Sequence, residues 1–129
     1  MKNPAASAYY VTPADITSNI PGRDDFYEDP DLQSLGISQA DPNGPAFNDT
    51  WQRGHCAPSE IMSSSLPSKH ACYTMANIGV QSGPFNMYQW QDLEKHVYDW
   101  VGANSALHIV TGVMYKDRSR PHWTVNSIA

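Results

Sequence analysis

The chain has 129 residues, 40% of them hydrophobic and 11% aromatic, which is enough apolar material for one packed domain and excludes wholesale disorder. Its formal net charge of −5 argues against a tight, passive binder of DNA or RNA, because such binding depends on basic patches and counterion release. An enzyme that holds phosphate through a divalent cation and a few arginines is less constrained by net charge.

The first part of the chain predicts one strand and a long loop. Residues 7–12 favour a short strand, which Pro13 ends because proline cannot donate to a strand ladder. Residues 13–49 are dominated by Pro, Gly, Asp, Asn and Ser, so we expect a long loop there rather than a second core. The acidic run at 24–29 is typical of a solvated surface turn.

The middle of the chain predicts two further strands. Residues 50–55 favour a strand that runs into His55, where Gly54 permits an unusual backbone angle or a close backbone approach. A polar loop follows. Residues 73–80 alternate and carry β-branched side chains, which predicts a strand that the Gly-Pro pair at 83–84 ends.

From Asn86 onward the pattern has the period of a helix. Apolar residues recur there at spacings of three and four, namely Trp90, Leu93, Val97, Trp100 and Val101. Gly102 lies just past them, as is typical of a helix end. Residues 107–115 are the clearest strand, and residues 123–129 indicate the approach to another. This order of elements predicts a single α+β domain over residues 1–129.

His55 is the candidate general base, because it follows Arg53 and Gly54 at a predicted strand end, where a side chain can project into a cleft. A neutral imidazole is the usual base near neutral pH. The other histidines have no comparable context and are expected to be structural, namely His70, His96, His108 and His122.

Asn86 has two interpretations that its position alone leaves open. At the start of the predicted helix it suits an N-cap, because its side chain accepts a backbone bond there. Alternatively, its amide oxygen is a ligand for hydrated Mg²⁺, which tolerates sparse, all-oxygen ligation. Glu94 follows at a rotation of about 80° and a rise of about 12 Å in an ideal helix, so it can lean back and hold the waters of that ion. In isolation, Glu94 suits a solvated helix position equally well.

Cys56 and Cys72 are the two cysteines, and the sequence leaves open whether they form a disulfide or are two buried thiols. Their spacing to His55 and His70 matches no common structural zinc pattern, so zinc is not expected. The N-terminus has no stretch like a signal peptide, and no segment approaches the roughly 20 apolar residues of a membrane span.

Several spaced motifs belong together. Residues 52–58, Gln-Arg-Gly-His-Cys-Ala-Pro, are similar to a signature of Asp-Arg-Gly-His, a small or apolar residue and Ala-Pro. Residues 77–81 and 86–94 follow Asn-x-x-x-Gln and then Asn-x-x-x-Trp-x-x-Leu-Glu. Residues 110–115 follow Val-Thr-Gly-x-x-Tyr, and residues 23–30 look like a segment that donates an active-site arginine. Over most of its length the chain therefore resembles the DNA/RNA non-specific endonucleases of the ββα-metal superfamily.

The resemblance implies a ββα-metal (His-Me finger) nuclease fold with a central, mostly antiparallel sheet. It implies that His55 activates water, that Asn86 directly binds Mg²⁺ or another divalent cation such as Mn²⁺, and that Glu94 holds this ion through water. Arg23 and Arg53 would contact phosphate and stabilise the transition-state charge. The implied substrate is DNA, RNA or both, cut without sequence preference to leave 5′-phosphates.

Two departures from the family pattern matter. Gln52 replaces the usual Asp, which removes a charge beside the metal site. The chain is also short for this family. It is either a minimal variant or a fragment whose sheet is truncated at both ends. The alternatives to an active nuclease are a degenerate module that keeps the fold and a hydrolase of small phosphodiesters. The resemblance slightly favours a secreted or extracytoplasmic location, while DNA or RNA preference and oligomeric state stay undetermined.

Overall fold

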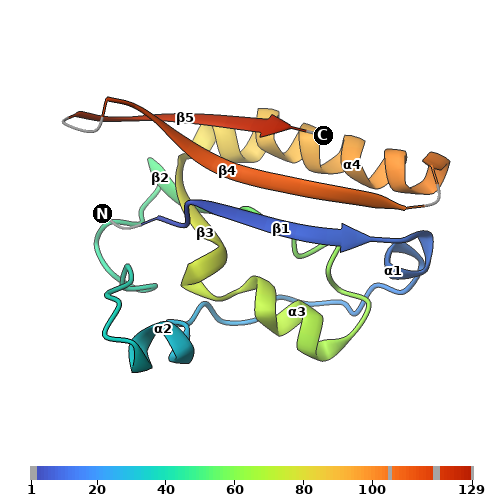
Figure 1. Cartoon of the computed structure of the whole chain (residues 1–129), viewed down its shortest axis with the longest axis horizontal. Coiled ribbons are helices and arrows are strands. Elements are labelled where there is room, and N and C mark those ends of the chain that lie inside the picture. The colour runs from blue at the N-terminus through green and yellow to red at the C-terminus, as the bar shows by residue number, and fades with distance from the viewer. Residues whose placement is uncertain (1–2, 105, 118–119, 129) are drawn as a thin grey trace.

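The computed structural model describes residues 3–104, 106–117 and 120–128, and its strands form two antiparallel sheets (Figure 1). The strands are β1 (Ala6–Val11), β2 (Trp51–His55), β3 (Ile78–Ser82), β4 (Leu107–Asp117) and β5 (Arg120–Ile128). The larger sheet has the order β1-β4-β5, and the smaller one pairs β2 with β3. The α+β class is confirmed, but the strands are divided between two sheets instead of forming one central sheet.

The strand predictions differ in accuracy. Those for residues 7–12, 50–55 and 107–115 are confirmed to within two residues at each end. The strand expected near residue 123 begins earlier, at the start of β5, and its predicted last residue lies outside the described residues. The prediction of a strand from Tyr73 is wrong, because Thr74 caps a short 3-10 turn, η1 (Met75–Asn77), that delays the start of β3.

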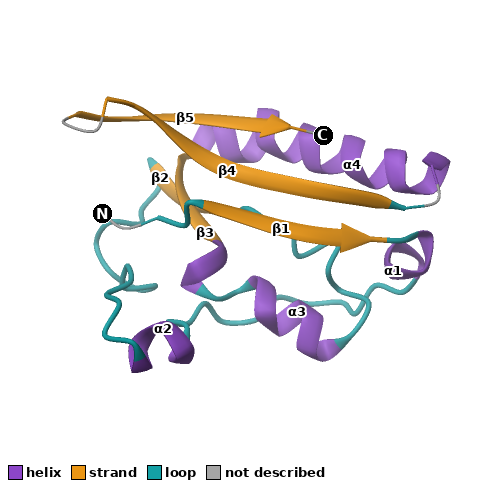
Figure 2. Ribbon diagram, viewed as in Figure 1, coloured by secondary structure: helices purple, strands orange, loops and turns teal. Residues whose placement is uncertain are grey.

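Three short helices occupy segments expected to be loops (Figure 2). They are α1 (Pro13–Thr17), α2 (Pro30–Ser34) and α3 (Leu66–Cys72). Each has a proline in its first turn, and the side chains of Asp29 and Ser65 accept backbone hydrogen bonds at the starts of α2 and α3. Helices of five to seven residues are too short to show a 3.6-residue hydrophobic period, so the pattern missed them.

The long helix predicted from the apolar stripe is present, but it begins and ends at other residues than predicted. It begins with a π-helical turn, η2 (Phe85–Trp90), and continues as α4 (Gln91–Asn104), past Gly102. The N-cap position belongs to Pro84, so the N-cap interpretation of Asn86 is wrong. The wider π turn also changes the angle between Asn86 and Glu94 from that of an ideal α-helix.

The main core lies between α4 and the larger sheet (Figure 2). Val97 and Val101 from the helix belong to one buried cluster with Val11 of β1 and Ile109 of β4. Ile61, from the segment between β2 and α3, completes this cluster. This packing places the start of the helix, η2, beside β3, with which it makes direct contact.

Both cysteines are buried free thiols, so the disulfide alternative is not observed. Burial raises the pKa of Cys56 to about 11 and that of Cys72 to about 12, which keeps both protonated at neutral pH. Among the helices of the described ranges, none has both the length and the apolar character of a membrane span.

Candidate active site

His55, the last residue of β2, lies in an aromatic environment. Its ring centroid is 5.6 Å from that of Phe26 and 5.1 Å from that of Tyr73, which meets it edge-on. Its Nε2 atom is buried and has no hydrogen-bond partner among the described residues. A buried polar atom of this kind needs an explanation, and a proton-accepting role toward a bound water is one.

The surroundings keep the His55 imidazole neutral. Burial lowers the pKa of His55 to about 4, and the positive charge of Arg23 lowers it further in the same direction. The ring is therefore unprotonated at neutral pH. It can accept a proton from water, although a lowered pKa also makes it a weaker base.

Gly54 and Trp90 fix the end of β2. A Cβ atom on Gly54 would lie 2.1 Å from Cδ of Gln81, so only glycine allows the neighbouring strand's side chain to pack there. The sequence left open an unusual backbone angle or a close backbone approach; the structure shows no positive φ at Gly54, and what approaches it is the Gln81 side chain. The indole Nε1 of Trp90 donates a 2.9 Å hydrogen bond to the His55 carbonyl, which ties the strand end to the helix.

Arg53 is held in place by a backbone carbonyl and two aromatic rings. Its Nε atom donates a 2.7 Å hydrogen bond to the carbonyl of Pro42, to which Nη2 also donates. Its guanidinium carbon lies 5.2 Å from the ring centroid of Phe26 and 4.6 Å from that of Phe47. Arg53 and His55 thus share Phe26 as a neighbour, as expected for alternate residues on one face of a strand.

Asn86 is paired with the residue that departs from the family pattern. Its Nδ2 donates a 2.9 Å hydrogen bond to Oε1 of Gln52, so the amide oxygen Oδ1 is the atom left for a cation. Both residues line an open pocket of about 570 Å³, here called the polar pocket. Arg23, Arg53 and Phe26 line it as well. The structure therefore brings three predicted site residues, Arg23, Arg53 and Asn86, to one pocket.

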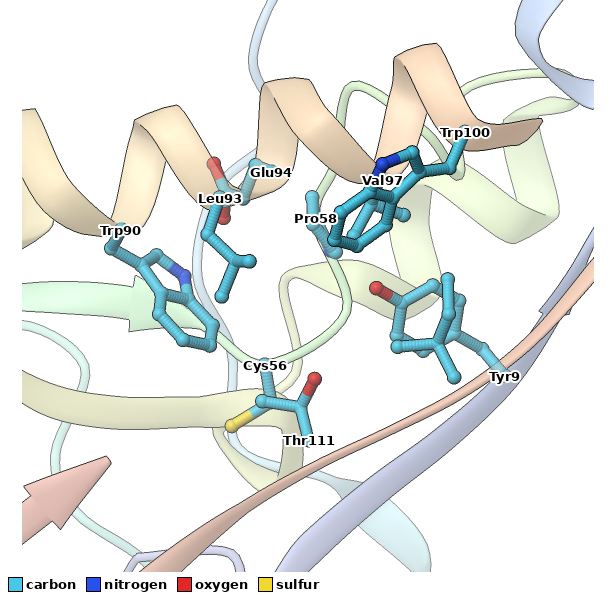
Figure 3. Close-up of a pocket in the computed structure, with 10 residues that line it drawn as sticks. Tyr9, Cys56, Pro58, Trp90, Leu93, Glu94, Val97, Trp100 and Thr111 are labelled. Atoms are coloured by element: carbon cyan, nitrogen blue, oxygen red, sulfur yellow. The ribbon is translucent and has the colours of Figure 1, made fainter. Parts of the chain in front are cut away.

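Glu94 lines a different pocket, here called the apolar pocket, of about 90 Å³ (Figure 3). Its neighbours there include Trp90, Val97 and Tyr9. Burial raises the pKa of Glu94 to about 7, Trp90 partly offsets this, and the charge of Glu60 adds to it. Neither Glu94 nor His55 is among the residues that line the polar pocket.

The donor set suits a weakly held, hydrated cation. The described residues contain no group of three or more His, Cys, Asp or Glu side chains placed to hold a metal ion. Asn86 offers one amide oxygen in an open pocket, which fits Mg²⁺ because that ion keeps several of its waters. Asn86 therefore fits the expected metal, whereas Glu94 does not share its pocket.

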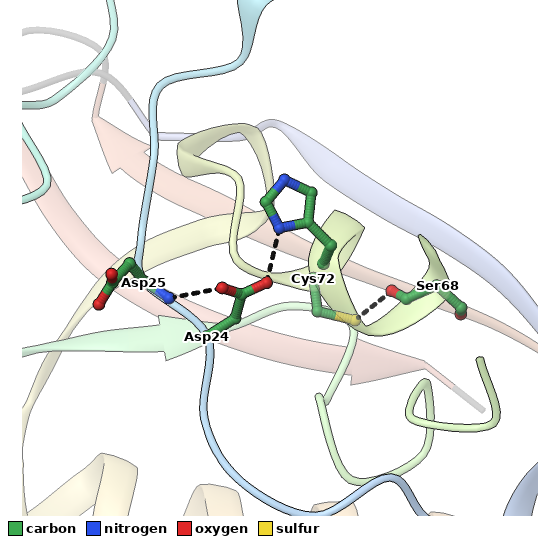
Figure 4. Close-up of polar contacts among 5 residues, drawn as sticks. Asp24, Asp25, Ser68 and Cys72 are labelled. Carbon is green, nitrogen blue, oxygen red and sulfur yellow. Dashed lines mark hydrogen bonds and ion pairs between the residues drawn. The ribbon is translucent and has the colours of Figure 1, made fainter. Parts of the chain in front are cut away.

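The segment that carries Arg23 is anchored to α3 (Figure 4). An oxygen of Asp24 lies 2.6 Å from Nδ1 of His70, and this contact lowers the pKa of Asp24. The Tyr27 ring stacks on His70 at 4.4 Å. The acidic run is thus partly engaged in contacts, in place of the fully solvated turn expected from the sequence.

The remaining histidines lie elsewhere. Nδ1 of His96 is 2.7 Å from the backbone oxygen of Asp92, and the ring of His108 packs against Tyr10. The side chain of His122 lies outside the described part of the chain.

Sequence reasoning missed the aromatic residues of the site. Phe26 contacts both Arg53 and His55, and Tyr73 contacts both Phe26 and His55. Phe26 lies three residues after Arg23, which is a weak signal, and nothing in its position marks Tyr73. Contacts between residues far apart in the chain carry no local pattern.

The comparisons with known proteins agree with the motifs. The family model for DNA/RNA non-specific endonucleases matches residues 1–129. No curated protein matches the chain.

Proposed function

The chain belongs to the DNA/RNA non-specific endonuclease family, and on that premise we propose that it hydrolyses phosphodiester bonds of DNA, RNA or both without sequence specificity. The observations that carry this proposal are the buried, unpartnered Nε2 of His55, whose ring packs against Phe26, and the pocket that Phe26 lines together with Arg23, Arg53 and Asn86. Together these supply a base, phosphate-binding cations and an oxygen ligand.

In the proposed mechanism His55 removes a proton from the attacking water. Its pKa of about 4 means that the ring is already neutral when substrate binds at physiological pH. Phe26 and Tyr73 hold the imidazole in place, so little ordering of the base is needed at the moment of reaction.

The two arginines have different parts in binding phosphate. Arg53 is preorganised by Pro42 and two aromatic rings, so it presents a fixed positive charge to the developing negative charge on phosphate. Arg23 is more exposed and lines the same pocket, where it can bind phosphate as substrate enters. Contacts to backbone phosphate carry no sequence information, which accounts for cutting without sequence preference.

Asn86 would hold Mg²⁺, Mn²⁺ or another divalent cation by Oδ1. When bound there, such an ion polarises the phosphate and stabilises the departing oxygen. Gln52 supports this role, because it accepts from the Asn86 amide nitrogen and so directs the amide oxygen elsewhere. A role for Glu94 through bound water stays a prediction, to be tested separately.

We extend the proposal to the fold of the site. The β2–β3 pair followed by η2 and α4 has the order strand, strand, helix, with His55 at the end of the first strand and Asn86 in the first turn of the helix. This order and these positions support a ββα-metal core. The larger sheet packs against the other part of the same helix.

The decisive variant is His55→Ala, assayed for plasmid degradation with Mg²⁺ and with EDTA. We expect a loss of rate of about 10²- to 10⁴-fold, because general-base catalysis contributes about that much. Nucleic-acid binding should be retained. Since the pKa of His55 is about 4, acid should protonate the parent's base only as the pH approaches that value.

The matched control is His108→Ala, which removes an exposed histidine on β4 that contacts Tyr10. Its rate should stay near that of the parent, and circular dichroism should show that both variants are folded. Cleavage by His55→Ala at the parent rate would disprove the assignment of the base. Undiminished cleavage in EDTA would remove the cation from the proposal.

The identity of residue 52 favours one alternative, a degenerate module that keeps the fold without turnover. The usual acidic residue is absent, and Gln52 contacts the proposed metal ligand directly. Gln52→Asp separates the two cases. Appearance of Mg²⁺-dependent cleavage would identify an impaired enzyme, whereas continued inactivity together with no measurable Mg²⁺ binding would favour the module.

A further inference from the structure

Trp51 is an exposed aromatic side chain in the wall of the polar pocket. It is 40% exposed and is the first residue of β2, two positions before Arg53. Met87, which is 47% exposed, lines the same pocket. Exposed apolar residues are common singly, but these two adjoin the proposed phosphate and cation ligands.

The backbone of Trp51 is held firmly. Its N–H donates a 3.0 Å hydrogen bond to Oδ1 of Asn48, which also accepts from the N–H of Thr50. The N–H of Asn48 in turn donates to the Trp51 carbonyl at 2.8 Å. The indole is therefore presented from a fixed turn, which lowers the entropy lost when a ligand packs against it.

The neighbours of Trp51 across the sheet are small. Its cross-strand partner is Ser82, and Gly83 follows immediately. A large partner at this position would pack over the indole, because directly opposed side chains in antiparallel strands are close together. Trp51 and Arg53 lie on one face of β2, about 6.6 Å apart along the strand.

Among the residues whose side chains the structure describes, few positive charges are available to bind nucleic acid. Among residues whose side chains are described, Lys69 donates to the carbonyls of Ile20 and Pro21, and Lys95 pairs with Asp99. Within that same part of the chain, Arg23 and Arg53 are the cations that line the polar pocket. In a chain with a net charge of −5, a contact to the base would add to the affinity that the phosphate contacts supply.

We propose that the Trp51 indole is a stacking platform for a nucleobase that adjoins the phosphate bound by Arg23 and Arg53, with Met87 at its edge. A base inside a duplex has both faces covered by its neighbours. Only an unpaired or displaced base can lie on an indole, so the preferred substrate is single-stranded or locally unpaired nucleic acid. This inference rests on the proposed function, since it places the base relative to that phosphate site.

The test measures binding in the His55→Ala background, in which cleavage is expected to be slow. Fluorescence anisotropy compares a labelled dT dodecamer, an abasic dodecamer with the same backbone, and a duplex of equal length. Adding Trp51→Ala should weaken binding of the dT strand by about 5- to 150-fold, the equivalent of about 1–3 kcal/mol for one stacked base. Binding of the abasic strand and of the duplex should change little. Trp51→Phe should restore most of the loss.

The matched control is Tyr10→Ala, which removes a 53% exposed aromatic residue of β1 outside the polar pocket and should leave binding unaltered. An equal effect of Trp51→Ala on all three ligands, or no effect on any, overturns the stacking inference. Trp51-dependent binding without any cleavage by the parent leaves the inference standing while the nuclease proposal fails. Absence of binding to every ligand overturns both.

Discussion

Burial shifts the pKa of two ionisable side chains toward their neutral forms in adjacent parts of this molecule, and the outcome differs between them. His55 lies among aromatic rings, one of which, Phe26, lines the polar pocket, and Glu94 lines the apolar pocket (Figure 3). Trp90 donates a hydrogen bond to the backbone of His55 and also interacts with the side chain of Glu94. Loss of water lowers the pKa of the imidazole to about 4 and raises that of the carboxyl to about 7.

The proposed roles of His55 and Glu94 require opposite charge states of the two side chains relative to the effect of burial. A neutral imidazole is the proton-accepting form, so burial supports the proposed role of His55. A carboxyl with a pKa of about 7 is only partly ionised at neutral pH, so burial weakens its attraction for a hydrated cation. Asn86 needs no charge to offer its oxygen, which makes the polar pocket the better place for a cation.

The largest expected effect comes from removing the oxygen of the polar pocket. Asn86→Leu should reduce Mg²⁺-dependent cleavage by at least about 100-fold, because metal ions contribute several kcal/mol of transition-state stabilisation. Titration calorimetry should show weaker Mg²⁺ binding. Gln89→Leu, an exposed change on the same π-helical turn, is the control and should cleave normally. Equal rates for the two variants would exclude Asn86 as the ligand.

The next effect concerns the apolar pocket and the stability of the protein. The pKa of Glu94 is about 7 when folded and near 4.5 when unfolded, so the folded state binds more protons between these values. Stability is therefore lost as the pH rises through this window. At pH 8 the free energy of unfolding of Glu94→Gln should exceed that of the parent by about 1–3 kcal/mol, so the variant is more stable there. At pH 4 the two values should differ little. Urea unfolding at several pH values measures this.

Asp92→Asn is the control for Glu94→Gln, because it removes an exposed carboxylate from the same helix. It should shift stability only slightly at any pH. A parent and a Glu94→Gln variant with the same pH dependence would show that burial does not raise the pKa of Glu94. The cleavage rate of Glu94→Gln tests the other proposed role of Glu94, the water-mediated contact with the cation. That contact requires the carboxylate, so its removal would lower the rate.

The smallest effect should come from the contact that orients Asn86. Gln52→Leu removes the acceptor of its amide nitrogen, which is worth about 0.5–1.5 kcal/mol for a typical hydrogen bond. The Mg²⁺ concentration for half-maximal cleavage should rise by about 2- to 12-fold. Gln52→Glu keeps an acceptor oxygen and adds a negative charge beside the cation, so its value should return to that of the parent or fall below it. Identical shifts in both variants would mean that Gln52 does not position Asn86.

Local sequence patterns predicted the parts of the site that depend on neighbouring residues. The signature at 52–58 marked Arg53 and His55 together, and hydrophobic periods located the long helix and the strand at 107–115. Hydrophobic patterns failed to predict helices that are too short to show a period and are marked mainly by their N-caps, such as α3. They also failed to anticipate the π-helical turn, which altered the relation between Asn86 and Glu94.

The sequence by itself determined the family, the candidate base and the class of chemistry, because these depend on residue types at short, ordered spacings. The tertiary structure alone decided which of these residues share a pocket and which are kept from water. Asn86 meets Gln52 across a separation of 34 residues, and Glu94 lines a pocket with residues of β1 and β4, which are far from it in the sequence. Desolvation and pairing depend on such distant neighbours, so no local pattern encodes whether a polar side chain is charged, oriented or available.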